Sequence, residues 1–309
     1  MRRLAAFLSI GLAPLATATV AIADESPATD APAGSYILPM IIAGQPARML
    51  VAPGETSTVT CTPDFARRAG LVAEDRRTFT QIGPIAVEGD VATVAFDIAW
   101  LTSRRTIVWP ANNWSAAIDC AMGPDALGAA VTRFDLRPPL PGERTIALPY
   151  DRPLGKRATG NAAYARIMVG DTSIAVRFDP LRRETVATAS AALVIAGALG
   201  GKLDGPTLRS EIFFGVTRPI RRVRLAEPLT VGPLSLDSVY ARLSDYGDAS
   251  AIRGVDSDEL DPGGDIVITG TRRRKIGDVR LLRIGADQLA TCSSIVFDRP
   301  AGQIRLTCR

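Results

Sequence analysis

One series of short segments occurs twice in this chain of 309 residues, and this duplication constrains the fold more than any other feature. In each half, two strand-like runs joined by a glycine lead into a tight turn, a short strand with hydroxyl side chains and a helix that ends at another glycine. The turns are Ala52-Pro53-Gly54 and Asp179-Pro180-Leu181, and the helices end at Gly70 and Gly197. A repeated series in fixed order predicts two lobes of one architecture.

Three later blocks also recur in order, each once per half. The first centres on Gly83 and Gly232, within the matched segments 82–87 and 231–236. The second has the pattern hydrophobic-Gly-x-Asp-x-Leu and occupies 122–127 and 284–289, and the third begins with Phe-Asp at 134 and 297. Matched blocks lie progressively farther apart along the chain, as insertions in the second copy would produce. We therefore interpret the pattern as a true duplication.

Each copy consists of short alternating runs between Gly/Pro turns with one or two short helices, which predicts an all-β, two-lobed fold. The expected organisation is lobe 1 at 37–150, a polar linker at 151–162 and lobe 2 at 163–309, with an insertion at 246–278. The Pro-, Ala- and Asp-rich segment 24–36 is expected to be disordered.

The first 23 residues are typical of a secretory signal peptide. Arg2 and Arg3 precede an apolar stretch, and Ala21-Ile22-Ala23 is a small-x-small cleavage site. An N-terminal membrane anchor is the alternative, but the stretch is short and contains Pro14, so we expect removal and no membrane span afterwards. Arginine greatly outnumbers lysine, as in GC-rich bacterial coding, so the expected location is a bacterial periplasm or the exterior.

Four cysteines fit an oxidising compartment and allow three ways of forming two disulfides. Cys292 and Cys308 flank an expected hairpin whose ends lie side by side, which predicts a disulfide between them. Cys61 and Cys120 then pair by elimination. A metal site is disfavoured because the chain has no C-x-x-C spacing.

The chain contains no histidine, which excludes Ser-His-Asp and Cys-His catalysis as well as imidazole metal ligands. The formal net charge is only +4, too small to indicate nucleic-acid binding. We expect no cofactor and no metal.

The duplicated order of strand, glycine, strand, turn, helix, hairpin and hydrophobic-Gly-x-Asp-x-Leu resembles the retropepsin and pepsin-like aspartic peptidases over nearly the whole of both lobes. The resemblance implies an acid-protease fold with a cleft between the lobes. It also implies that each lobe supplies one aspartate, from an Asp-Thr/Ser-Gly turn, to a shared pair. The segments around Gly83 and Gly232 would be the flap hairpins, and Gly54 would line the cleft.

Both turns depart from the pattern that this resemblance implies. Ala52 stands at the aspartate position of lobe 1, which leaves Asp179 as the one catalytic candidate of the pair. Pro180 and Leu181 replace the hydroxyl residue and the glycine of lobe 2. Since two close carboxyl groups must share a proton for this chemistry, a single aspartate predicts impaired catalysis.

Glu55 is the nearest acid that could replace the missing aspartate. Its side chain is long enough to reach the centre, but its direction does not follow from the sequence. A surface or turn-stabilising glutamate is the favoured interpretation.

Three functional hypotheses follow. The leading one is a secreted, catalytically impaired aspartic-peptidase-like protein that binds an extended peptide or protein segment between its lobes. The second is an active aspartic endopeptidase that uses Asp179 with a non-standard second acid. The third is a periplasmic scaffold that binds a partner through the insertion at 246–278. The sequence leaves the oligomeric state open.

Overall fold

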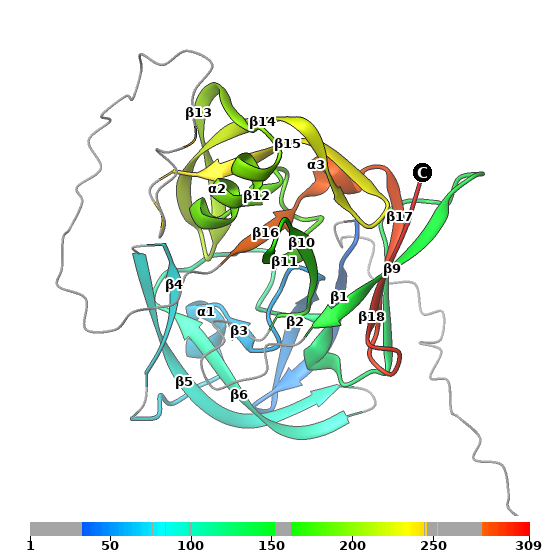
Figure 1. The fold of residues 1–309 in the computed structure, drawn as a ribbon. Helices are drawn as coiled ribbons and strands as arrows, with labels where there is room; N and C mark the ends of the chain where they lie inside the picture. The colour runs from blue at the N-terminus through cyan, green and yellow to red at the C-terminus, as the bar shows by residue number, and fades with distance from the viewer. Residues whose placement is uncertain are drawn as a thin grey trace, which may run out of the picture.

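A computed structural model describes residues 33–75, 77–83, 85–98, 101–151, 162–243, 245, 252 and 280–309 (Figure 1). The predicted signal peptide, most of the segment 24–36, the linker interior and nearly all of the insertion 246–278 lie outside the described residues. Of the helices described, none is long and apolar enough to cross a membrane.

The first half of the chain folds into a seven-stranded sheet in the order β1-β2-β7-β3-β6-β5-β4. A short pairing of β1 with β5 brings the sheet round into a barrel, with Phe65 and Phe96 fully buried inside. The elements are β1 (Tyr36–Ile42), β2 (Gln45–Val51), β3 (Val59–Cys61), α1 (Pro63–Arg68), β4 (Arg77–Ile82), β5 (Ile85–Ile98), β6 (Leu101–Pro110), β7 (Cys120–Met122) and the 3-10 helix η1 (Pro124–Leu127).

The second half forms most of an eleven-stranded sheet in the order β13-β14-β15-β12-β16-β11-β10-β9-β18-β17-β8. Two of these strands, β8 (Val131–Asp135) and β9 (Arg144–Asp151), come from the first half and flank the last hairpin. The others are β10 (Tyr164–Val169), β11 (Thr172–Phe178), β12 (Val186–Ala187), β13 (Lys202–Phe213), β14 (Val216–Val231), β15 (Leu234–Arg242), β16 (Leu281–Ile284), β17 (Cys292–Asp298) and β18 (Gln303–Cys308), with helices α2 (Ala189–Ala198) and α3 (Ala286–Leu289).

The two lobes repeat one topology. In lobe 1, β2 pairs in parallel with β7, which pairs antiparallel with β3, and β3 pairs in parallel with β6. In lobe 2, β11, β16, β12 and β15 show the same three pairings in the same order. The predicted all-β, two-lobed architecture with few short helices is thus confirmed, and its repeat is visible strand by strand.

The match between the segments around Gly83 and Gly232 is wrong, because the two segments do not lie in equivalent hairpins. Gly83 lies at the turn between β4 and β5, whereas Gly232 lies between β14 and β15. Because β15 is the counterpart of β6, the hairpin β4–β5 corresponds to β13–β14, whose turn contains Phe214 and Gly215. Gly83 and Gly232 resemble each other for a local reason, since both turns hold a glycine at positive φ, +59° and +58°.

Both predicted disulfides are present. Cys61 and Cys120 face each other across β3 and β7, and Cys292 and Cys308 across β17 and β18. All four cysteines are buried, so the bonds belong to the cores of the lobes. Two disulfides fit an extracellular or periplasmic protein.

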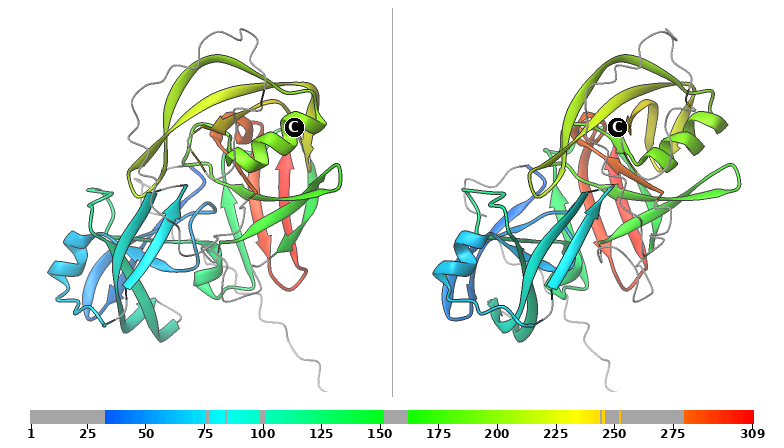
Figure 2. Two further views of the ribbon diagram at one scale, coloured as in Figure 1. Left: turned by 60° about the vertical axis from the view of Figure 1, so that its left-hand side comes forward. Right: turned by 90° about the vertical axis from the view of Figure 1, so that its left-hand side faces the viewer.

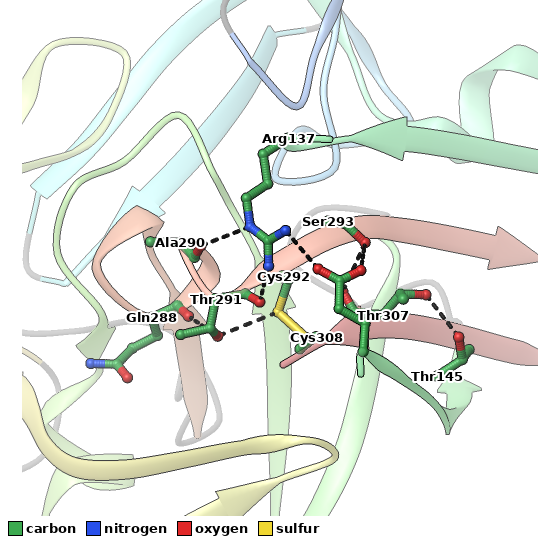
Figure 3. Close-up of a disulfide and its surroundings, with 10 residues drawn as sticks. Arg137, Thr145, Gln288, Ala290, Thr291, Cys292, Ser293, Thr307 and Cys308 are labelled. Atoms are coloured by element: carbon green, nitrogen blue, oxygen red, sulfur yellow. Dashed lines mark hydrogen bonds and ion pairs between the residues drawn. A yellow bond between two sulfur atoms is a disulfide. The ribbon is translucent and has the colours of Figure 1, made fainter. Parts of the chain in front are cut away.

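A polar network ties the second disulfide to the first half of the chain (Figure 3). Arg137 donates to the carbonyl oxygens of Ala290 at 3.2 Å and Thr291 at 2.6 Å, and it pairs with Glu143 at 2.6 Å. Glu143 also accepts from the Ser293 hydroxyl at 2.6 Å. The region after β8 is therefore attached to the last hairpin through charge-assisted hydrogen bonds.

The two disulfides should differ in how much they stabilise the fold, because they close loops of different length. Cys61–Cys120 spans 59 residues and Cys292–Cys308 spans 16. On loop-closure entropy alone, the variant C61A/C120A should lose about 1 kcal/mol more unfolding free energy than C292A/C308A. Urea denaturation of both variants measures this, and an equal or reversed order would contradict the loop-entropy explanation.

Candidate functional site

The turns that follow β2 and β11 are built alike. In lobe 1 the Glu55 amide donates to the Ala52 carbonyl at 3.2 Å, and in lobe 2 the Arg182 amide donates to the Asp179 carbonyl at 3.2 Å. The amide of Ala52 donates to Met122, and that of Asp179 donates to Ile284, the last residues of β7 and β16. Ala52 and Asp179 therefore occupy equivalent positions.

The two turns touch each other across the lobes. A Cβ atom on Gly54 would lie 2.4 Å from Cγ of Asp179, so only glycine permits this approach without a shift. Asp179 is 9% exposed as a result. The predicted site residues Gly54 and Asp179 are thus in direct contact.

Ala52 lies in apolar surroundings. It is fully buried in a cluster with Ile37, Leu50 and Ala121, and Leu181 of lobe 2 packs against that cluster. The two departures from the implied motif, Ala52 and Leu181, therefore complement each other. An unpaired carboxylate in this place would be costly to bury.

The corresponding positions of lobe 2 carry charges instead. Leu50 is paired with Ala121 in the parallel register of β2 and β7, and Arg177 is paired with Arg283 in that of β11 and β16. Counted from the equivalent turns, the apolar set of lobe 1 matches the charged set of lobe 2: Leu50 with Arg177, Ala52 with Asp179, and Ala121 with Arg283.

Glu55 is electrostatically coupled to Asp179. Its side chain is partly buried, and burial first and the Asp179 charge second raise its pKa to about 7. Arg182 and Arg177 oppose this rise. Glu55 thus belongs to the turn after β2, in keeping with the turn part of the favoured interpretation, but its carboxyl group is coupled to Asp179 of lobe 2 and not simply exposed at the surface.

Arg182 joins this region to the β13–β14 hairpin. It pairs with Glu211 at 2.9 Å, and its Nε lies 4.0 Å from Oδ2 of Asp179. Burial would lower the pKa of Arg182, but the charges of Asp179 and Glu211 raise it on balance. Glu211 also accepts from the Gly215 amide at 3.0 Å, which holds the hairpin turn.

Arg177 and Arg283 lie deeper. Arg177 reaches lobe 1, where its Nη1 donates to the Gly54 carbonyl at 3.4 Å, and burial lowers its pKa. Arg283 donates to the carbonyls of Glu211 and Ile212 at 3.3 and 3.1 Å, and burial lowers its pKa to about 10. Sequence reasoning missed these arginines. The available signal was that both stand one residue before the end of a strand next to the Asp179 turn.

The tips of the equivalent hairpins rest on the opposite lobe (Figure 2). At the β13–β14 tip, the Phe214 carbonyl accepts from Asn112 at 2.5 Å, and its ring lies 6.0 Å from that of Trp114. At the β4–β5 tip, a Cβ on Gly83 would lie 2.5 Å from Oδ1 of Asp245. Both tips therefore bridge the lobes.

Gly232 is not part of this arrangement. A Cβ there would contact Leu148 of β9 at 3.3 Å, so its turn lies against the sheet of lobe 2. The prediction that Gly232 belongs to a flap equivalent to that of Gly83 is wrong, because it assumed the hairpin match corrected above.

An apolar groove of about 740 Å³ lies elsewhere, on lobe 1. Ile37, Pro39, Ile41 and Pro46 form much of it, with Asp97 near the end of β5. It includes none of the residues of the turn contact. Within the described part of the chain, no group of acidic or cysteine side chains is arranged to hold a metal ion.

Comparisons with known proteins give limited information. No protein-family model matches this sequence, and no curated protein sequence matches it. Among solved structures, the chain is similar to an aspartic proteinase from Irpex lacteus, with 13% identity and a TM-score of 0.40. This similarity covers 89% of this chain and 94% of that one.

The raised pKa of Glu55 should appear in the pH dependence of stability. Between its ordinary value of 4.5 and about 7, folded Glu55 holds a proton that the unfolded chain releases, so stability falls as pH rises through this window. Glu55→Gln mimics the protonated form. It should leave stability unchanged at pH 4 and raise it by about 1–3 kcal/mol at pH 8.

Urea unfolding at the two pH values measures this difference. The exposed Glu227→Gln serves as the matched control and should change stability little at either pH. A Glu55→Gln variant that is less stable than the natural protein at pH 8 would show that ionised Glu55 stabilises the junction.

Proposed function

We propose that this protein is a secreted or periplasmic, aspartic-peptidase-like protein with impaired catalysis that binds an extended peptide or protein segment where its lobes meet. The observation that carries the proposal is the composition of the turn contact. An apolar alanine and an arginine–carboxylate network occupy the place where the resembled peptidases hold a hydroxyl-supported pair of aspartates.

The surroundings of Asp179 support the impaired catalysis that we propose. Attack by water on a peptide carbonyl requires one carboxylate that accepts the water proton and a second, protonated carboxyl group that polarises the carbonyl. The position equivalent to Asp179 is Ala52, and Asp179 itself packs on Gly54 with Arg182 nearby. These contacts favour a structural charge network over an acid pair that faces a bound water.

Binding of an extended segment is supported by the edges of the sheets. Among the described strands, β4 is the outermost strand of the lobe 1 sheet, and β13 is an outermost strand of the lobe 2 sheet. These two edges belong to the equivalent hairpins whose tips bridge the lobes. An edge strand offers unpaired N–H and C=O groups, to which an extended chain can add by backbone hydrogen bonds.

Strand addition predicts that every second backbone amide of the ligand forms a hydrogen bond with the edge strand. Capped octapeptides that bind in a library screen should lose at least tenfold in affinity when alternate amides on one side are N-methylated. Methylation of the other amides should change affinity less than threefold, because those groups point away from the edge. Fluorescence anisotropy measures both series, and equal losses for both sets of amides would contradict strand addition.

A second candidate function is acid-catalysed peptide hydrolysis, and the coupling between Glu55 and Asp179 favours it. Asp179 would take the proton of the attacking water while protonated Glu55 donates to the carbonyl oxygen. The C–N bond would then break as the leaving amine gains a proton.

A cleavage assay decides between the two candidates. Under the leading proposal, the natural protein cleaves denatured casein no faster than Asp179→Asn does at any pH from 3 to 8. Cleavage that is lost in both Asp179→Asn and Glu55→Gln would replace the leading proposal with the second. The scaffold hypothesis rests on the insertion 246–278, outside the described residues, and stays a prediction.

A further inference from the structure

Two arginines lie side by side in the sheet of lobe 2, at the base of the turn contact. Arg177 and Arg283 are register partners on the parallel strands β11 and β16. Like charges opposite each other on neighbouring strands destabilise a sheet. The burial that lowers both pKa values is a further cost of keeping these groups charged.

The architecture does not require arginine at these positions. Lobe 1 is built on the same topology and places Leu50 opposite Ala121 there, within an apolar cluster. A fold that accepts a leucine–alanine pair in one lobe would be expected to accept it in the other. The arginine pair therefore calls for an explanation other than folding.

Several donor atoms of the pair donate no hydrogen bond within the described part of the chain. Arg283 is 7% exposed and donates from Nη1 to two carbonyls of β13. Its Nε and Nη2 atoms, and the Nε atom of Arg177, are buried and donate no hydrogen bond to any residue that the structure describes. Buried donors without acceptors are costly, so an acceptor group there would be strongly favoured.

The local charges are also out of balance. The Glu211 carboxylate forms an ion pair with Arg182 and accepts a hydrogen bond from the Gly215 amide. Glu55 is largely protonated below its pKa of about 7. Among the residues that the structure describes, Asp179 is then the negative charge that acts most strongly on Arg177 and Arg283, and Arg182 shares it. The pair lacks about one negative charge.

We propose that Arg177 and Arg283 bind a carboxylate group of the bound segment, so that the protein selects peptides with an acidic residue or a free C-terminus. This inference rests on the proposed peptide-binding function. A carboxylate supplies the missing charge, and its two oxygens match the fork of N–H donors on a guanidinium group.

The β13–β14 hairpin contacts the pair directly through Arg283. The carbonyls that Arg283 holds belong to Glu211 and Ile212 of β13, just before the tip that rests on Asn112 and Trp114. In the proposed complex, the segment that holds Glu211 and Ile212 would move away from Arg283, so that a carboxylate can reach its guanidinium group. An incoming carboxylate can then replace the two carbonyls as the acceptor for Arg283.

The test uses three probe peptides of one length, taken from a sequence that binds in the library screen. The first has an internal glutamate and a C-terminal amide, the second an internal glutamine and a free C-terminal carboxylate, and the third an internal glutamine and a C-terminal amide. Affinities are measured for the natural full chain at pH 6 by isothermal titration calorimetry.

Three variants accompany the natural chain. R177L/R283A gives the two register positions of lobe 2 the leucine and alanine that lobe 1 holds there and keeps Asp179 beside Arg182, Arg177→Gln removes one charge alone, and Arg104→Gln changes an exposed arginine of β6 as the control. At least one carboxylate peptide should bind the natural chain tenfold or more tightly than the neutral peptide. This preference should fall below threefold in the first two variants and persist in the control, with neutral-peptide affinity unchanged in all.

The outcomes separate this inference from the function on which it rests. Equal affinity for all three peptides, or a preference that survives in both arginine variants, would overturn the carboxylate site while strand binding stands. If no peptide binds the natural chain, the proposed function and the inference both fail. The unchanged binding of the neutral peptide shows that each variant is folded.

Discussion

The close approach of the Asp179 side chain to Gly54 is the contact on which the arrangement of the lobes depends. It brings together two turns with the same hydrogen bonds, the lobe 1 turn in apolar surroundings and the lobe 2 turn among charged side chains. Because the side chain lies where any Cβ on residue 54 would stand, the lobes meet closely only with glycine there. Leu181 then packs on the apolar cluster of lobe 1, and Arg177 reaches the Gly54 carbonyl from the opposite lobe. Apolar packing, a hydrogen bond and charge attraction all act across this contact.

The duplication has preserved the topology of the lobes while the chemistry of their matched positions has diverged. Leucine and alanine in lobe 1 are matched by two arginines in lobe 2, and Ala52 by Asp179. Apolar residues stabilise this position by burial alone, whereas buried arginines need acceptors and counter-charges. One lobe therefore supplies a packing surface and the other a polar one. This asymmetry is the basis of the proposed ligand site between the two halves.

The duplication was sufficient to predict the two lobes, the last hairpin predicted the disulfide Cys292–Cys308, and Cys61–Cys120 followed by elimination. Glycine turns, alternating strands and cysteines at hairpin ends report on neighbours that lie close along the chain. The match between Gly83 and Gly232 failed because it rested on a local turn sequence alone. Similar turn sequences need not occupy equivalent places in a topology. The burial of Glu55 and the pairing of Arg177 with Arg283 depend on contacts between lobes or between distant strands. No local pattern encodes such contacts, so these parts of the site required the three-dimensional structure.

The most direct test of the buried, charge-coupled junction is a carbon-13 NMR titration of the Glu55 carboxyl group, in the natural chain and in Asp179→Asn. The contact between the turns predicts a pKa near 7 in the natural chain, because burial and the Asp179 charge both raise it. Removal of that charge should lower the pKa clearly, although burial should keep it above the ordinary value of 4.5. A Glu55 carboxyl that titrates near 4.5 in both proteins would contradict the junction, because it would place this side chain in water and away from Asp179.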